Sequence, residues 1–341
     1  MATSSSSPGL SGWLTSLDLL EPTPEPHRVA SVSRAQALQI LRCQQGVLDE
    51  LCARGLPHSG TPPEERYDSS DLTNLALGSE SRRSIPELGA SFIARLANGT
   101  PPDWVTEQRW RVQARALAVH QGECGTDPRW SFRRPVPERF GGECLEWKEG
   151  GSLSMIDHRV AVDPEHPSTL SLSGIVHTRG EMRVVRSPTL QSLYREMVDT
   201  LSFAAMPIAL ATDVQVVAKA KAADCVGISN LLEHECRRAG YRAWARRGLL
   251  LGMLGAGEHS WLEVVDDDDE TKVLDPTLPI VARRRSPRPT PDFTAFCIGS
   301  ISNRLLPFDC SAGEQIAEHH CGRSPARAHL ITAVESQDRT T

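Results

Sequence analysis

The sequence has no long apolar stretch, and none approaches the ~18 residues that a membrane-spanning helix needs. Residues 1–8 also lack the basic cluster and the apolar core of a secretory signal. A content of 39% hydrophobic and 23% charged residues is typical of a globular chain. We therefore expect a cytoplasmic protein without a membrane partner.

Metal ligands at characteristic spacings are also missing. The nine cysteines include no pair at the spacing of a zinc site. Two histidines and a cysteine are adjacent at 319–321, but neighbouring side chains on one helix point in different directions. The five acids of residues 266–270 lack the spaced ligands and the glycine of a calcium loop. We predict no metal and no cofactor, and an odd number of cysteines without a secretory signal predicts reduced thiols.

The chain has no excess of basic residues. Its formal net charge of −6 argues against nucleic acid as a main partner. The strongest basic run is Arg283 to Arg285 with Arg288, in a segment that holds three prolines. A run of this kind is usually a solvated loop. The alternative is a subsite for an anion, such as a phosphopantetheine arm or a substrate carboxylate.

The first candidate functional residue is Cys225. Asp224 is a natural N-cap, and apolar residues at helical spacing follow it until Gly240. Cys225 therefore falls in the first turn, where free N–H groups and the helix dipole stabilise a thiolate and could bind an oxyanion. Cys236, deep in the same helix, is not next to the free N–H groups and the positive end of the helix dipole.

A second and a third candidate follow on a predicted hairpin. Residues 259–265 alternate as a strand does, with His259 at its start. The acids of 266–270 predict an exposed hairpin tip, and the returning strand over 271–274 ends at Asp275. Because His259 begins its strand and Asp275 follows the antiparallel partner strand, we expect the two residues to lie close together.

These three residue types form a known chemical unit. A thiol attacks carbonyl groups as a thiolate, and it needs an imidazole close by to accept its proton. The imidazole in turn needs a carboxylate that fixes its tautomer and balances its charge. Each residue alone is more often structural, but the joint pattern of Cys225, His259 and Asp275 indicates a catalytic triad.

Four short segments carry a family resemblance. They are Asp224-Cys225-x-x-x-Ser229-x-Leu231-Leu232, Arg238-Ala239-Gly240-Tyr241-Arg242-Ala243, His259-Ser260-Trp261-Leu262-Glu263-Val264 and Leu274-Asp275-Pro276-Thr277. Over about residues 190–280 the chain resembles the transglutaminase-like superfamily. The resemblance implies an α+β fold with a papain-like site, in which the nucleophile helix packs on an antiparallel sheet. It implies Cys225 as nucleophile, His259 as general base and Asp275 as the residue that orients it.

The resemblance leaves parts of the site open. Ala223 stands where many relatives carry a glycine two residues before the cysteine. Relatives also supply a side-chain oxyanion donor from upstream of the cysteine, and Gln215 is our candidate although no motif surrounds it. Trp261, on the same strand face as His259, is our candidate substrate-binding residue.

Composition and periodicity divide the chain into five segments. They are a disordered Ser/Pro-rich N-terminus (1–30), a mostly helical region (31–140), a β-rich segment (141–189), a transglutaminase-like catalytic core (190–310) and a C-terminal extension with a disordered tail (311–341). In the helical region, helices are predicted from residue 33 to 55, over 85–96 and over 105–119. The N-terminal portion either recognises a substrate or carrier, or only covers the core.

The chemistry implied by the triad is acyl transfer through a thioester intermediate. If an amine releases the acyl group from Cys225, the enzyme forms an amide bond, for example in a biosynthetic pathway. If water releases it, the same triad makes a peptidase or amidase. The third alternative is a non-catalytic binding module. The expected partner is a small-molecule, peptide or carrier-bound acyl substrate, and no oligomeric state is predicted.

Overall fold

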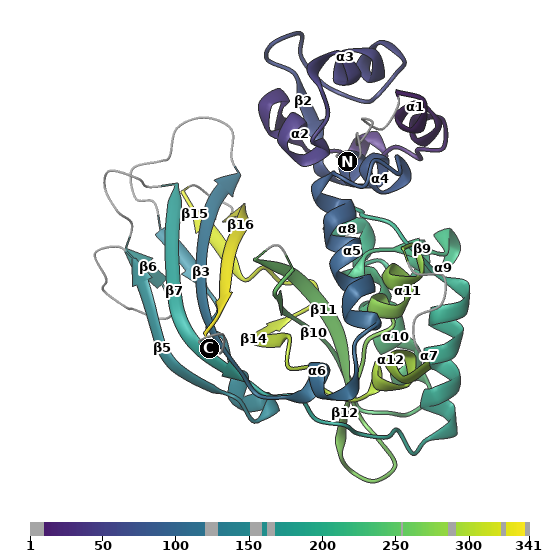
Figure 1. The fold of residues 1–341 in the computed structure, drawn as a ribbon, viewed down its shortest axis with the longest axis vertical. Helices are drawn as coiled ribbons and strands as arrows, with labels where there is room; N and C mark the ends of the chain where they lie inside the picture. Colours follow the sequence, from purple (N-terminus) through teal and green to yellow (C-terminus); the bar gives the residue numbers. More distant parts are fainter. Residues whose placement is uncertain are drawn as a thin grey trace, which may run out of the picture.

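The computed structural model describes residues 10–119, 129–150, 159–161, 168–253, 255–285, 291–321 and 325–337. It has three parts (Figure 1): a small N-terminal lobe, a core in which helices cover a five-stranded sheet, and a separate seven-stranded sheet. The helix α5 (Ile85–Ala97) connects the lobe to the core. The overall class is α+β, as the sequence predicts.

The N-terminal lobe is built from short elements around its own apolar cluster. They are α1 (Leu10–Asp18), η1 (Glu25–His27), β1 (Ala30–Ser33), α2 (Arg34–Leu41), α3 (Gln45–Ala53), β2 (Arg66–Asp68) and α4 (Ser69–Gly78). The predicted disorder of residues 1–30 is wrong from residue 10 onward, because Trp13 is buried in this cluster. The helix predicted from 33 to 55 is two helices, since Arg42 takes a left-handed conformation that ends α2.

The seven-stranded sheet draws strands from both ends of the chain. Its order is β5-β7-β3-β16-β15-β4-β6, with β3 (Gln108–Val119), β4 (Arg129–Phe132), β5 (Glu143–Gly150), β6 (Arg159–Ala161), β7 (Thr169–Thr178), β15 (Ala317–His320) and β16 (Pro325–Ser336). The predicted C-terminal extension is therefore an integral part of this sheet, because β16 pairs with β3 from Arg327 to Ser336.

The helix predicted over 105–119 is wrong. A short helix, α6 (Pro101–Val105), ends there, and β3 follows it. In β3 every second residue from Trp110 to Ala116 is buried, which is the period of a strand. The alanines and arginines of this stretch favour a helix by propensity, but pairing with β7 and β16 on both sides overrides it. The helical region thus ends near residue 105 instead of 140.

The core sheet is antiparallel throughout, in the order β13-β12-β11-β10-β14. Its strands are β10 (Ala243–Leu251), β11 (Ala256–Val265), β12 (Thr271–Leu274), β13 (Ile298–Gly299) and β14 (Leu305–Ser311). The helices around it are α7 (Pro188–Thr200), α8 (Ile208–Ala211), α9 (Val214–Ala220), α10 (Cys225–Arg238), α11 (Thr277–Arg283) and α12 (Pro291–Phe296). A small parallel pair, β8 (Ser202–Phe203) with β9 (Ala222–Ala223), precedes α10.

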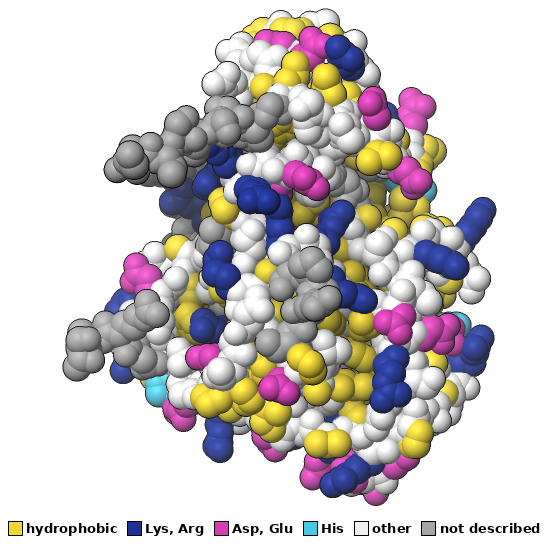
Figure 2. Space-filling view, turned by 45° about the vertical axis from the view of Figure 1, so that its right-hand side comes forward, with side chains coloured by type: hydrophobic (Ala, Val, Ile, Leu, Met, Phe, Trp, Pro, Cys, Tyr) yellow, Lys and Arg dark blue, Asp and Glu magenta, His cyan; other side chains and the backbone are white. Residues whose placement is uncertain are grey.

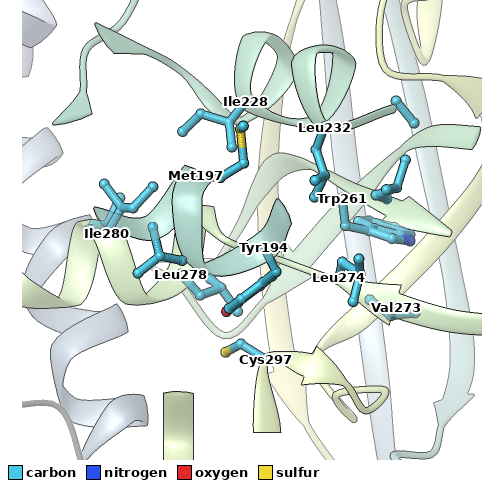
Figure 3. Close-up of a cluster of buried hydrophobic side chains, with 14 of the residues drawn as sticks. Tyr194, Met197, Ile228, Leu232, Trp261, Val273, Leu274, Leu278, Ile280 and Cys297 are labelled. Carbon is cyan, nitrogen blue, oxygen red and sulfur yellow. The ribbon is translucent and has the colours of Figure 1, made fainter. Parts of the chain in front are cut away.

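One apolar cluster joins the helices to the core sheet (Figure 3). Leu232 of α10 lies with Tyr194 and Met197 of α7 above Leu274 of β12, and all four are buried. Burial of such side chains stabilises the fold by roughly 1.5–3 kcal/mol each. The cluster therefore fixes α10, which begins with Cys225, against the sheet that carries His259.

The basic run near residue 285 is neither a solvated loop nor an open anion subsite. Arg285 forms an ion pair with Glu87 of α5, whose side chain is fully buried. Arg283 donates to the main-chain carbonyl of Val198 in α7. These two arginines therefore connect helices, because each finds its acceptor inside the protein. Arg288 lies outside the described residues.

Charge on the outer surface is mixed. On the face shown in Figure 2, Lys and Arg prevail across the middle, whereas Asp and Glu gather at the right-hand and lower edges. Within the described part of the chain, no helix combines the length and the apolar character required to cross a bilayer.

Replacing Leu232 with alanine tests the packing of α10 on the sheet. We expect Leu232→Ala to lower the free energy of unfolding by about 2–5 kcal/mol, because it leaves a cavity in the cluster. Urea denaturation followed by circular dichroism measures it. His234→Ala on the exposed side of the same helix is the control, with an expected change below about 0.5 kcal/mol. Equal effects of the two substitutions would contradict this packing.

Candidate active site

Cys225 is the first residue of α10, and Asp224 is its N-cap, as the sequence predicts. The Asp224 carboxylate accepts from the N–H of Gly227 at 3.0 Å, and its main-chain oxygen accepts from the N–H of Ile228 at 3.0 Å. The first turn of a helix has N–H groups without an intrahelical partner, and Cys225 and Val226, which both line the cavity, are in that turn. A negative charge that forms beside Cys225 would meet the N–H groups of both.

A glycine permits the close approach at the start of α10. A Cβ on Gly227 would lie 2.7 Å from the Cβ of Ala223 and 3.1 Å from Val217 of α9. Ala223 is the position at which many transglutaminase-like proteins carry glycine. Here the missing side chain of Gly227, one turn later, makes room for the Ala223 methyl group.

His259 and Asp275 meet as the hairpin prediction requires. Leu262 of β11 lies opposite Leu274 of β12. Asp275, which follows β12, therefore lies near His259, where the buried part of β11 begins. The Nε2 of His259 lies 2.7 Å from Oδ2 of Asp275, and both residues are buried. The other carboxylate oxygen, Oδ1, accepts from the N–H of Leu278 at 3.3 Å, which fixes the carboxylate against α11.

The predicted exposed hairpin tip needs one correction. Asp266, the first of the five acids, is buried. Its carboxylate accepts from the N–H of Ser187 at 3.0 Å and from that of Arg186. The remaining acids turn the chain, and Lys272 pairs with Asp268 at 2.9 Å. Asp266 therefore anchors the segment before α7.

The electrostatics of the site favour a charged imidazole. Burial by itself lowers the pKa of His259, but the adjacent Asp275 carboxylate and the hydrogen bond with the Cys225 thiol outweigh it and raise the pKa to about 10. Since Nε2 faces Asp275, we assign Nδ1 as the nitrogen that faces Cys225. At neutral pH this arrangement favours the imidazolium form of His259.

Cys225 and His259 open into a cavity of about 310 Å³ whose walls come from all three parts of the fold. The N-terminal lobe contributes Val29, Ser31, Asp68, Ser69 and Ser70; the C-terminal strands and the residues before them contribute Gln315, Ala317, Ala328 and Leu330. The sequence analysis named none of these nine residues, because no motif surrounds them. Tertiary contacts alone bring them to the site.

Two predicted site residues lie elsewhere. Trp261 is fully buried, with its ring 6.1 Å from that of His259 and 6.0 Å from that of Phe140, and it does not line the cavity. Figure 3 shows it within the apolar cluster. It therefore packs beside the imidazole and cannot contact a substrate in this arrangement. Gln215 is an exposed residue of α9 outside the cavity wall, so it is not placed as an oxyanion donor.

The eight described cysteines are free thiols. In six of them burial raises the pKa, which makes the thiol less reactive; these are Cys43, Cys52, Cys144, Cys236, Cys297 and Cys310. For Cys43 the pKa rises to about 11 and for Cys236 to about 12. None of the six lines the cavity around His259.

The histidines at 319 and 320 lie on strand β15 and not on a helix. The ring of His319 packs 4.8 Å from that of Trp130, and Nε2 of His320 lies 2.8 Å from the Ser131 hydroxyl. Within the described ranges, no three His, Cys, Asp or Glu side chains are grouped as a metal ion would require.

Comparison with known proteins adds one structural similarity. A solved structure of a candidate cysteine protease from Cytophaga hutchinsonii aligns with 69% of this chain and 93% of its own length, at 11% identity and a TM-score of 0.42. No family model matches the chain, and no curated protein matches it.

The raised pKa of His259 gives a pH dependence of stability. The folded value of about 10 exceeds the ordinary value of 6.5, so protonated His259 stabilises the fold fully below pH 6.5. This stabilisation is lost as the pH rises toward 10. Asp275→Asn removes the carboxylate that raises the pKa of His259. Between pH 6.5 and 10 the free energy of unfolding of this variant should therefore fall less than that of the native protein.

Urea denaturation at pH 6, 8 and 10 measures this difference. Asp267→Asn, at the exposed hairpin turn, is the control and should follow the native curve. If the native protein and Asp275→Asn lose stability in parallel, the imidazolium assignment is wrong.

Proposed function

We propose that this protein is a cysteine acyl-transfer enzyme with Cys225 as nucleophile, His259 as general acid and base, and Asp275 as the orienting residue. The observation that carries the proposal is that the thiol at the start of α10 shares a cavity with an imidazole held by a buried carboxylate at 2.7 Å. The transglutaminase-like resemblance of residues 190–280 supports the same assignment.

In the first half-reaction, the Cys225 thiolate attacks the carbonyl carbon of an amide or thioester. A C–S bond forms, and the carbonyl oxygen takes the negative charge, within reach of the Cys225 and Val226 N–H groups. The tetrahedral species then collapses and expels the amine or thiol. His259 gives its proton to this leaving group, and an acyl thioester on Cys225 remains.

In the second half-reaction, we propose that an amine releases the acyl group. The amine attacks the thioester carbon, His259 takes the amine proton, and the Cys225 thiolate leaves as the amide forms. Walls from three parts of the chain support this choice, because an enclosed site limits access of water to the thioester. If water attacks instead, the same steps make a peptidase or amidase.

Covalent catalysis is tested by intact-mass spectrometry after exposure to a panel of acyl thioesters and activated amides. We expect an acyl adduct on the native chain and none on Cys225→Ala, because the variant has no nucleophile at the cavity. Cys43→Ala is the control: it removes a partly exposed thiol outside the cavity and should keep the adduct. An adduct that persists in Cys225→Ala would overturn the assignment.

Product analysis with and without an added amine separates the candidate activities. An amide product that depends on the amine supports transfer, whereas free acid formed at the same rate in both cases supports hydrolysis. If no donor forms an adduct and Cys225→Ala changes nothing but stability, the protein is a binding module.

The triad should act as one unit. We expect His259→Ala to reduce the acylation rate nearly as much as Cys225→Ala, because the proton transfers are lost. Asp275→Asn should keep measurable activity, since the amide can still hold the ring. Single-turnover acylation rates measure both variants. An Asp275→Asn variant that acylates as fast as the native protein would remove Asp275 from the triad.

A further inference from the structure

The cavity around Cys225 is acidic. Three carboxylates line it, from Asp68, Asp224 and Glu258, together with one guanidinium, that of Arg247. The His259 imidazolium also lines it, but Asp275 balances its charge. The face of the molecule shown in Figure 2 carries both signs of charge, whereas carboxylates outnumber the guanidinium in the lining of the cavity.

Arg247 does not balance the other carboxylates. Its guanidinium pairs with Glu258 at 3.0 Å and donates to the Ala312 carbonyl at 3.2 Å. Its side chain is only 13% exposed. Arg247 and Glu258 together therefore carry no net charge, and the N–H groups of Arg247 that make these contacts already have acceptors within the protein.

Asp68 is a buried carboxylate that main-chain N–H groups hold in place. It is 3% exposed, its Oδ1 accepts from the N–H of Ser70 at 2.8 Å, and its Oδ2 accepts from that of Val29 at 2.7 Å. Among the described residues no Lys, Arg or His forms an ion pair with it. Asp71, three residues later, differs because Arg28 lies 3.8 Å away. Each carboxylate oxygen keeps lone pairs that a further donor can use.

The cavity also contains an unused hydroxyl. Ser260 is 1% exposed and lines the cavity, and its Oγ has no hydrogen-bond partner among the described residues. Buried polar atoms are nearly always paired in native proteins. Ser260 lines the same cavity as Cys225 and His259, so a substrate in the cavity would find a free hydrogen-bonding group in its wall.

We propose that the acyl donor carries a cationic group, an ammonium or a guanidinium, which Asp68 binds while Ser260 accepts or donates a hydrogen bond to the same molecule. This inference rests on the proposed acyl transfer. It assigns the N-terminal lobe the role of substrate recognition, since Asp68 is the last residue of β2 in that lobe. A buried carboxylate without a counter-ion attracts a cation more strongly than a solvated one does.

The test compares aryl thioesters that differ in charge: guanidinohexanoyl, its neutral isostere ureidohexanoyl, and the shorter, anionic adipoyl. Intact-mass spectrometry follows acylation of Cys225 with each donor. We expect the guanidino donor to acylate about tenfold faster than the ureido donor, with the adipoyl donor slowest, as a partly shielded charge pair implies.

Asp68→Asn should reduce this preference to about twofold or less, because it removes the charge that distinguishes the guanidino donor from the ureido donor. Asparagine is also a good N-cap, so α4 can keep its start. Asp71→Asn is the matched control, because it removes a buried carboxylate from the same helix outside the cavity wall, and it should keep the preference. If Asp68→Asn fails to fold, Glu258→Gln should also weaken the preference, because it leaves the positive charge of Arg247 unbalanced in the cavity.

The outcomes separate the two proposals. Acylation at equal rates by all three donors overturns cation recognition and leaves acyl transfer standing. A preference that persists in both Asp68→Asn and Glu258→Gln also overturns it. No acylation by any donor overturns the proposed function, and the inference falls with it.

Discussion

The buried pair of His259 and Asp275 is the contact on which the rest of the site depends. It requires the register of β11 against β12, because a shift by one residue would turn one of the two side chains to the opposite face of the sheet. It also requires the start of α11, since the Leu278 N–H holds the second oxygen of Asp275. The position of α10 matters equally, because the cluster around Leu232 sets how close Cys225 comes to the imidazole.

A buried ion pair is costly unless all its partners are satisfied, and here the surroundings meet that condition. Asp275 accepts from His259 and Leu278, and its N–H donates to the Cys297 carbonyl at 3.0 Å. Trp261 packs beside the imidazole and limits its contact with water. The side chain that we predicted to bind substrate therefore serves the site indirectly, through the packing around His259.

The parts of the fold that the sequence predicted well are those that rest on local signals. The cap at Asp224, the left-handed Gly240 after the helix, and the alternation of residues 259–265 each depend on neighbours within one element. Residues 105–119 were predicted wrongly for the opposite reason. Alanine and arginine favour a helix there, but strands from residues 169–178 and 325–336 pair with this stretch and make it a strand.

The sequence by itself determined where Cys225, His259 and Asp275 lie within their elements, because a capped helix and a hairpin place them through local geometry. Only the tertiary structure decided what surrounds them. Asp68 and Gln315 are 157 and 90 residues from Cys225, and no periodicity or motif predicts contacts over such separations. Arg285 is a further example: its basic run favoured a solvated loop, but in the structure it pairs with Glu87, which is far away in the sequence. Long-range burial, which depends on the whole chain, therefore shapes the cavity and its charge.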